Sequence, residues 1–331
     1  MRIFFRSKIS QKKTQALVLK PLVENIWEEY FTKIERSNLI HSWAYGEAKR
    51  NIEGWGVTGY VLMDEELPLA LLQVRKKTYG LVKLVRINRG PLWFNTQLHK
   101  KYEHEFYRLM RITYAKRKGY ILLFSPESSN ANATQMALTA NRFVQYKRKQ
   151  IGTIWLDLSK SDEELKKSLR SKWRNQLRGC EKASLDVAEL PIAEHWEWFV
   201  TQYQLFRSNK DFTGPNMRLL LKLIDIIQDN PTYNSSIFCV SSMGNALAAT
   251  LMIKHGAAAT YLLAWNNSDG RRMNASNLLL WSAVLSLKQQ GCRWLDLGGI
   301  SECNPVGKAI AHFKRGLGGE EMWFAGDFIA L

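Results

Sequence analysis

Residues 286 to 320 read SLKQQGCRWLDLGGISECNPVGKAIAHFKRGLGGE and combine the end of a helix, a short apolar segment and a glycine-rich turn. Gly291 stands where a helix is expected to end, because glycine adopts the left-handed conformation of helix stops without a Cβ penalty. Trp294 to Leu297 is short and apolar, which predicts a central strand. Gly298 and Gly299 allow the backbone to turn directly after it. A helix that leads into a buried strand indicates an α/β protein.

The same order of elements occurs twice along the chain. Tyr60 to Lys77 and Ile237 to Gly256 each contain two apolar segments around a polar turn, which predicts a hairpin in each half. Downstream of the hairpins, Tyr114 to Phe124 and Ser286 to Leu297 each predict a helix end, a glycine and an apolar strand. We therefore expect a duplicated α/β domain, with the join near residues 145 to 160. A chance similarity between two α/β halves is the alternative.

The segment after the join predicts a basic helix. Ser161 and Glu164 have the spacing of a capping box at its start. Apolar residues then recur every four positions and predict one apolar stripe, formed by Leu165, Leu169, Trp173 and Leu177. Lysines and arginines occupy the other positions, a pattern that is typical of a solvated basic face.

Length and composition indicate a globular chain of two domains, with 331 residues of which 46% are hydrophobic. No run of about 18 apolar residues occurs, so we expect no membrane span. The start, MRIFFRSKIS, lacks the apolar segment and cleavage site of a signal peptide. The four cysteines and six histidines show no metal-ligand spacing, which predicts reduced thiols in a cytoplasmic protein and no metal site.

The net charge of +17 is concentrated in the first half of the chain. Residues 1–150 contain 27 Lys and Arg against 12 Asp and Glu, whereas residues 151–331 contain 20 against 18. Such a field attracts nucleic acid, anionic lipid headgroups or a diphosphate-linked substrate, and it does not discriminate among them. A generally basic, soluble surface is the alternative reading of the charge.

The letters LDLGGI … HFKRGLGGE in the C-terminal stretch resemble the C-terminal signature of the Fem-type aminoacyl-tRNA-dependent transferases. The resemblance implies an α/β (α+β) fold of two tandem acetyltransferase-like (GNAT) domains. These would be residues 1–150, completed by residues 314–331, and residues 151–313. The implied reaction moves an amino acid from aminoacyl-tRNA to an amine of a peptidoglycan-precursor stem peptide, with aminoacyl-tRNA as co-substrate and no further cofactor. No long heptad segment occurs, so we expect the form without a coiled-coil arm.

The resemblance also assigns roles to single residues. Lys314 matches the cation that stabilises the tetrahedral oxyanion, and Phe313 sets the direction of that lysine. Lys49 matches a lysine that contacts the substrate diphosphate, and Tyr261 matches a tyrosine that faces the substrate. Structural alternatives stay open: Lys314 as a surface lysine beside Arg315, Lys49 as a cation over aromatic rings, and Tyr261 as a core tyrosine.

Further basic residues are candidates for substrate binding. Arg174 and Arg178 match an R-x-x-x-R helix that opens the second domain in the family. Arg207 and Lys210 are two candidates for a basic residue that binds the second phosphate. VRINRGPLWF, residues 85–94, resembles the family's R-x-x-x-GP strand and turn, and we interpret it as a structural strand end.

Two other classes of function stay open. One is an acyl-CoA-dependent N-acyltransferase on the same fold, and the other is a non-catalytic basic protein that binds RNA or membrane surfaces. RGLGG resembles an acyl-CoA pyrophosphate loop, but such a loop needs a helix after it, and EEMWFAGDFIAL predicts a strand. For the transferase, we expect aminoacyl-tRNA and a lipid-linked or UDP-linked precursor as partners. We also expect a cytoplasmic monomer that can contact the anionic inner face of the membrane.

Overall fold

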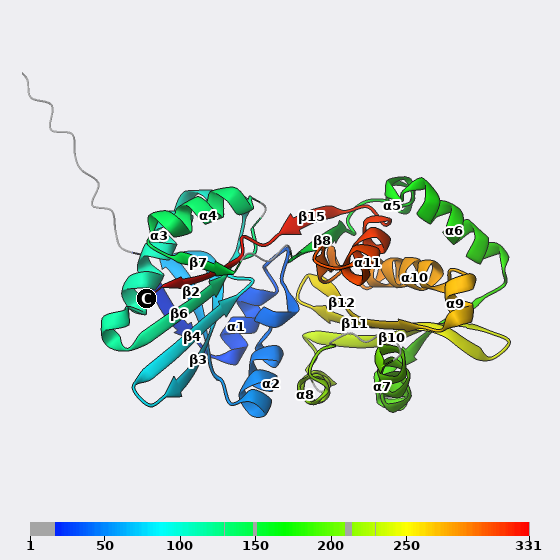
Figure 1. Cartoon of the computed structure of the whole chain (residues 1–331), viewed down its shortest axis with the longest axis horizontal. Helices are drawn as coiled ribbons and strands as arrows, with labels where there is room; N and C mark the ends of the chain where they lie inside the picture. The colour runs from blue at the N-terminus through cyan, green and yellow to red at the C-terminus, as the bar shows by residue number, and fades with distance from the viewer. Residues whose placement is uncertain (1–16, 129, 148–150, 209–213, 229, 331) are drawn as a thin grey trace, which may run out of the picture.

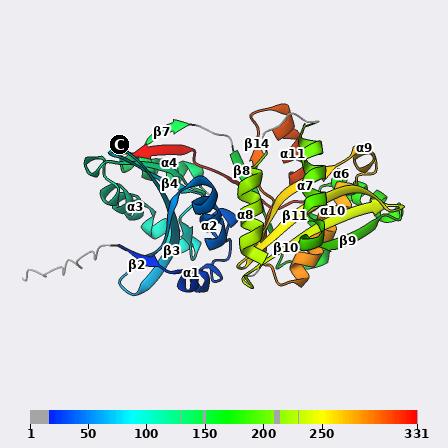
Figure 2. The same ribbon diagram turned by 90° about the horizontal axis from the view of Figure 1, so that it is seen from below.

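The computed structural model of the chain describes residues 17–128, 130–147, 151–208, 214–228 and 230–330. These residues form two lobes side by side, each built on one mixed sheet with helices on both faces (Figures 1 and 2). This arrangement confirms the predicted α/β class. In the described residues, the longest helix has 18 residues and no coiled-coil arm projects from either lobe.

The first lobe contains an eight-stranded sheet and the helices that cover it. Its strands are β1 (Val18–Leu22), β2 (Gly56–Asp64), β3 (Leu67–Tyr79), β4 (Val82–Asn88), β5 (Leu92–Trp93), β6 (Tyr120–Ser125), β7 (Val144–Lys147) and β16 (Asp327–Ala330). Its helices are α1 (Glu24–Phe31), η1 (Leu39–His41), α2 (Trp43–Glu53), α3 (Thr96–Thr113), η2 (Lys116–Lys118) and α4 (Ala131–Ala140). The strand order is β1-β2-β3-β4-β6-β16-β7, and β5 pairs with β3.

The second lobe repeats this plan with another eight-stranded sheet. Its strands are β8 (Ile151–Asp157), β9 (Asp186–Pro191), β10 (Tyr233–Ser242), β11 (Asn245–His255), β12 (Ala258–Asn266), β13 (Trp294–Asp296), β14 (Ile300–Ser301) and β15 (Glu320–Trp323). Its helices are α5 (Asp162–Ser168), α6 (Ser171–Lys182), α7 (Ile192–Ser208), α8 (Met217–Gln228), α9 (Ser268–Arg272), α10 (Ala275–Gln289) and α11 (Pro305–Arg315). The strand order is β14-β8-β13-β12-β11-β10-β9, and β15 pairs with β8.

The internal repeat predicted from the sequence corresponds to a repeated topology. In the first lobe, the hairpin β2–β3 is followed by β4, α3 and β6; in the second, β10–β11 is followed by β12, α10 and β13. The last two strands of each series pair in parallel. Gly119 (φ 79°) and Gly291 (φ 81°) both take the left-handed conformation before the final strand, as the pattern predicts. In the first lobe, however, a 3₁₀ turn separates α3 from Gly119.

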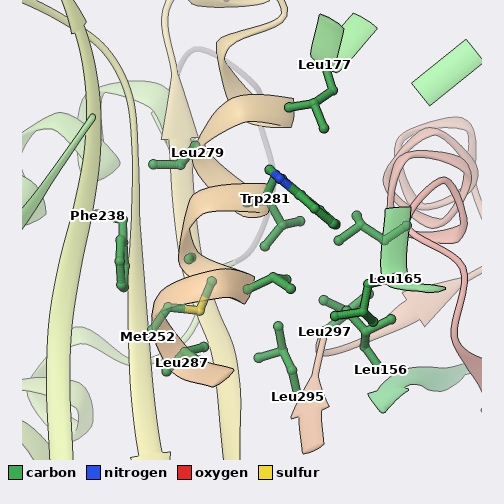
Figure 3. Packing of buried hydrophobic residues seen from close by; sticks show 14 of the residues in the cluster. Leu156, Leu165, Leu177, Phe238, Met252, Leu279, Trp281, Leu287, Leu295 and Leu297 are labelled. Carbon is green, nitrogen blue, oxygen red and sulfur yellow. The ribbon is translucent and has the colours of Figure 1, made fainter. Parts of the chain in front are cut away.

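A layer of helices and the sheet form the core of the second lobe. Figure 3 shows α10 in the middle of this cluster, with Phe238 and Met252 of the sheet on one side and Leu165 and Leu177 on the other. All four residues of the predicted apolar stripe are buried. The predicted single helix is nevertheless two helices, because Leu169 is extended (ψ 132°) and the Arg170 N–H donates to the Gly316 carbonyl. A tertiary hydrogen bond thus interrupts a helix that the local pattern favours.

The C-terminal residues pass from one sheet to the other (Figure 1). β15 pairs with β8 in the second sheet, and β16 then lies between β6 and β7 in the first. The strand pairing therefore places the return to the first lobe after β15, later in the chain than the domain boundary expected at residue 314. Residues 314–323 lie with the second lobe, where α11 packs into its core, and β16 joins the first sheet.

The two lobes share a hydrophobic core. α2 of the first lobe and α8 of the second lie side by side in both views (Figures 1 and 2). Ala44 and Ala48 of α2 belong to the same buried cluster as Leu220, Leu223 and Ile224 of α8. Burial of small and branched side chains across this contact holds the lobes together and closes one side of the space between them.

A buried carboxyl group also joins the lobes. Tyr233 of β10 donates to Glu28 of α1 over 2.5 Å, and the second oxygen of Glu28, Oε2, is buried without a hydrogen-bond partner among the described residues. Burial raises the pKa of Glu28 from 4.5 to about 7, although the Tyr233 hydrogen bond opposes this. The folded protein therefore binds this proton more tightly than the unfolded chain does.

We expect Glu28→Gln to change how stability depends on pH. Because the folded-state pKa is raised, Glu28 lowers stability progressively as the pH rises from about 4.5 to about 7. The variant should exceed the wild type in free energy of unfolding by on the order of 1 kcal/mol at about pH 8, and by little at about pH 5. Urea unfolding at the two pH values measures this. A variant that is less stable than the wild type at both pH values would show that the hydrogen bond from Tyr233 to the charged Glu28 stabilises the fold by more than the burial of the charge costs.

Candidate active site

The second sheet opens where its two parallel strands separate. β12 and β13 pair from Ala258 with Trp294 to Thr260 with Asp296, and no further. Beyond this point, Leu262 is an extra residue on β12, because Met252 of β11 faces Tyr261 and its neighbour Leu251 faces Leu263. A bulge of this kind redirects side chains next to a site. Ligands of α/β sheets commonly bind beyond the carboxyl ends of such strands.

A cavity of about 260 Å³ lies at this opening, between the two lobes. It is lined by Leu39, Ile40, Tyr45, Arg89, Pro215, Asn216, Leu219, Leu220, Leu223, Thr260, Tyr261, Leu262, Gly298, Gly299 and Lys314. We call it the Lys314 cavity. Gly298 (φ 71°) is required at its wall, because a Cβ there would lie 3.0 Å from the Tyr261 carbonyl oxygen and 3.6 Å from Lys314 Nζ.

Lys314 brings a buried ammonium group to the cavity from α11. The residue is only 6% exposed, and its Nζ donates to the Gly299 carbonyl oxygen over 2.8 Å. The same Nζ lies 5.5 Å from the centre of the Tyr261 ring, which provides a cation–π contact. Burial lowers the pKa of Lys314 from 10.5 to about 8, against the opposing effect of Asp296. The alternative of a surface lysine is therefore wrong.

Phe313 and Lys314 have different environments. Phe313 packs into the core of the second lobe, with its ring centre 6.2 Å from that of Trp173. It does not line the Lys314 cavity. Its contribution is to anchor α11, and a role of Phe313 in setting the direction of Lys314 stays a prediction.

An ion-pair network that the sequence analysis did not find lies at the meeting point of the two sheets. Arg89 and Glu127 follow the carboxyl ends of the parallel strands β4 and β6, and Asp296 ends β13. Arg89 Nε lies 2.6 Å from Glu127, and its Nη2 lies 2.8 Å from Asp296. Thr153 and the Gly298 N–H donate to the other Asp296 oxygen, and Trp155 donates to Glu127. The network thus connects the two lobes through charges.

Asp296 is fully buried within this network. Burial alone would raise its pKa, but Arg89 and the hydrogen bonds from Thr153 and Gly298 hold the pKa below its usual 3.8. Arg89 also lines a second cavity of about 320 Å³ between the lobes, together with Glu127, Trp155 and Trp294. The segment that we interpreted only as a strand end therefore supplies a residue to both cavities. Its signal in the sequence was a basic residue directly before Gly-Pro.

Tyr261 and Lys49 differ in how close they come to the cavity. Tyr261 lines it, as the resemblance implies, and burial raises the pKa of its hydroxyl. Lys49 is not among the lining residues: its Nζ lies 2.5 Å from Glu53 and 5.7 Å from the centre of the Tyr45 ring. Tyr45 itself lines the cavity, with Arg75 5.1 Å from its ring centre. The alternative of a cation over an aromatic ring thus describes the position of Lys49, and a diphosphate contact stays a prediction.

The remaining basic candidates that the structure describes do not line the Lys314 cavity. Arg174 is half-buried and Arg178 is exposed on α6, and neither lines the cavity. Arg207 is half-buried near the end of α7, and its side chain lies next to Gly214, one residue before the lining residue Pro215. Lys210 lies outside the described residues. The structure therefore brings Tyr261 and Lys314 together at one cavity, and the other described candidates do not line it.

The described residues contain no group of three or more His, Cys, Asp or Glu side chains that could hold a metal ion. No helix in the part of the chain that the structure describes is long and apolar enough to cross a membrane.

The two repeated lobes and the opened second sheet are the features of a tandem acetyltransferase-like fold. The chain resembles the structure of FemX with a TM-score of 0.75 and 13% identity, covering 94% of this chain and 96% of that chain. It also resembles a conserved protein of unknown function from Bacteroides thetaiotaomicron (TM-score 0.58, 11% identity, 95% and 98% covered). A tandem GNAT protein from the clavulanic acid biosynthesis pathway is similar too (TM-score 0.51, 12% identity, 95% and 98% covered). At these identities the similarity shows the fold.

The sequence comparison is more specific in one segment. Residues 238–331, less than a third of the chain, match the model of the FemAB family, and this segment resembles Fem-type proteins. The matched segment contains Tyr261, the glycine turn and Lys314. The resemblance that the C-terminal signature indicated is thereby confirmed. No curated protein matches the chain.

Proposed function

We propose that the protein is an aminoacyltransferase that moves an amino acid from aminoacyl-tRNA to an amine of a peptidoglycan-precursor stem peptide. The FemAB segment and the tandem fold support an acyltransferase in general. The observation that carries the finer proposal is the position of Lys314, whose buried ammonium lies in a cavity between the two lobes. A cation in this place is suited to an anionic transition state.

The chemistry follows from what a buried ammonium can do. The acceptor amine attacks the carbonyl carbon of the aminoacyl ester, the C–N bond forms, and negative charge develops on the carbonyl oxygen. Lysine has three N–H donors, and the hydrogen bond to Gly299 uses one of them. A preorganised donor in a site that excludes water stabilises this charge more than water does. Collapse of the intermediate then breaks the C–O bond, and the proton that the attacking nitrogen loses passes to the ribose oxygen, which leaves as the hydroxyl of the tRNA.

The two lobes supply the orientation that such a reaction needs. Residues from η1 and α2 of the first lobe and from α8, β12 and α11 of the second line one cavity. Two substrates held between them react as one unimolecular complex, which lowers the entropic part of the barrier. Among the lining residues described, none is a carboxylate or a histidine that would serve as a general base. We infer that the acceptor amine reacts in its neutral form.

The charge state of Lys314 leads to a prediction about pH. Because the oxyanion needs the protonated lysine, turnover relative to that of Lys314→Arg should fall as the pH rises through about 8, the pKa of Lys314. The comparison is relative because the neutral acceptor amine becomes more abundant with pH in both proteins. Lys314→Arg should retain the cation at every accessible pH and lose this alkaline decline, at a lower maximal rate. The measurement is the initial transfer rate between about pH 6 and 10, corrected for ester hydrolysis. A ratio of the wild-type rate to the Lys314→Arg rate that rises above pH 8 would mean that Lys314 acts as a neutral base.

Binding of tRNA gives a further prediction. The basic first half and α6 should bind tRNA with an affinity that falls steeply with salt. The double variant Arg174→Gln/Arg178→Gln should reduce the slope of the logarithm of the association constant against the logarithm of the salt concentration. The expected reduction is about 1 for each phosphate that the arginines neutralise. Filter binding over a salt series measures the slope, and Lys222→Gln on α8 serves as the control. Absence of tRNA binding at low salt, together with binding of acetyl-CoA, would favour the acyl-CoA alternative.

A further inference from the structure

The walls of the Lys314 cavity are mainly apolar. Three leucines of α8, at positions 219, 220 and 223, face it, and each is at least 94% buried. Leu39 of η1 closes the cavity from the first lobe, and the rings of Tyr45 and Tyr261 contribute further apolar surface. A ligand group that enters between these side chains must give up water without gaining hydrogen bonds from the leucine wall.

The charges at the cavity have one sign. Lys314 and Arg89 are the charged residues among its described lining, and both are cations. Arg89 is already paired with Glu127 and Asp296, and Asp296 is itself fully buried and does not line the cavity. A cationic side chain would meet no carboxylate among the described lining residues. An anionic side chain would compete with the oxyanion for Lys314, and an uncharged apolar group has neither disadvantage.

The size of the cavity agrees with a large apolar group. An apolar protein cavity of about 150 Å³ is sufficient to bind benzene. The Lys314 cavity has a volume of about 260 Å³, so a leucine-sized or phenylalanine-sized group fits beside an ester carbonyl. A glycyl group would leave most of the leucine wall uncovered and would forgo the corresponding free energy of transfer.

We propose that the acyl group carried to Lys314 has an uncharged, apolar side chain of leucine to phenylalanine size. This inference rests on the proposed function, because it takes the carbonyl at Lys314 to belong to the transferred group. The same chemistry can arrive on a tRNA or on another carrier such as coenzyme A. The apolar wall selects the side chain of the group and does not select its carrier.

The first test is a donor panel with the intact protein. Leucyl-, phenylalanyl-, glycyl-, lysyl- and glutamyl-tRNA are compared by kcat/KM with one stem-peptide acceptor. We expect leucyl- or phenylalanyl-tRNA to exceed the other three by roughly 10-fold to 200-fold, the discrimination that one or a few methylene groups provide. A preference for the glycyl, lysyl or glutamyl donor would overturn the inference and leave the proposed function standing.

The second test measures binding without turnover. Calorimetry compares L-leucinamide, L-phenylalaninamide, glycinamide and L-lysinamide, and we expect the first two to bind at least about ten times more tightly than the others. Equal or weaker binding of the apolar amides overturns the inference. Tighter binding of these amides, combined with transfer from leucyl or phenylalanyl thioesters of coenzyme A and none from tRNA, would contradict the proposed function and support the inference.

Variants of α8 test whether its leucines, which form the apolar wall of the cavity, determine the preference for the side chain. Leu220→Phe narrows the cavity and should reduce binding of L-phenylalaninamide about tenfold or more, whereas Leu220→Ala should shift the preference toward the larger amide. Leu221→Phe on the same helix is the matched control, because Leu221 is 47% exposed and does not line the cavity. Circular dichroism verifies the fold of each variant. If Leu220→Phe and Leu221→Phe have equal effects on binding, the leucine wall is not the binding site.

Discussion

Lys314→Met is expected to reduce turnover by a factor of about 10² to 10³ while substrate binding stays nearly unchanged. This is the typical cost of losing one preorganised oxyanion donor. The loss should appear in kcat with little change in KM, because the interaction forms only when charge develops on the carbonyl oxygen. Steady-state transfer kinetics with separately measured substrate affinities give both quantities.

The fold of this variant should be intact. Burial already disfavours the charged form of Lys314, as its lowered pKa shows, and methionine has a similar length and no charge to desolvate. Its thermal stability should equal or exceed that of the wild type. Lys308→Met, at an exposed position of the same helix, is the control and should transfer at the wild-type rate. Turnover of Lys314→Met within a few-fold of the wild type would contradict the mechanism.

The largest loss of stability is expected from Asp296→Asn. Removing one charge of a buried ion pair leaves its partner uncompensated, which typically costs about 3–5 kcal/mol. Here Arg89 would keep Glu127 but lose the carboxylate that joins it to the second lobe. Urea denaturation of both proteins measures the difference in free energy of unfolding.

A matched surface substitution separates burial from charge. Asp225→Asn removes the carboxylate of the exposed pair with Lys222 and should cost no more than about 0.5 kcal/mol. A similar cost for the two variants would show that the Arg89 network does not hold the lobes together. Since the pKa of Asp296 is lowered in the folded state, its contribution to stability is present at neutral pH and is lost as the pH falls below 3.8.

The class of the fold and the candidate site residue Lys314 were accessible from the sequence. Helix ends, hairpin turns and buried strands have short-range signatures, so the two hairpins and the glycines at 119 and 291 predicted a repeat that the two sheets reproduce. Lys314 could be named because it lies in a short, specific segment that resembles one family. The helix ends, turns and strands depend on residues that are close together in the sequence and have local physical causes, whereas Lys314 was named from the resemblance alone.

Other features were decided only by tertiary structure. Arg89, Glu127 and Asp296 are far apart in the sequence, and an ion pair between distant residues has no spacing that a pattern could reveal. The break between α5 and α6 depends on a hydrogen bond to Gly316, against a continuous helical pattern. The leucines of α8 have no signal in the sequence that distinguishes them from core residues, and only the separation of β12 from β13 and the approach of the first lobe placed them around Lys314. The sequence by itself thus determined the two halves and a cationic residue, and packing between the halves decided what surrounds that residue.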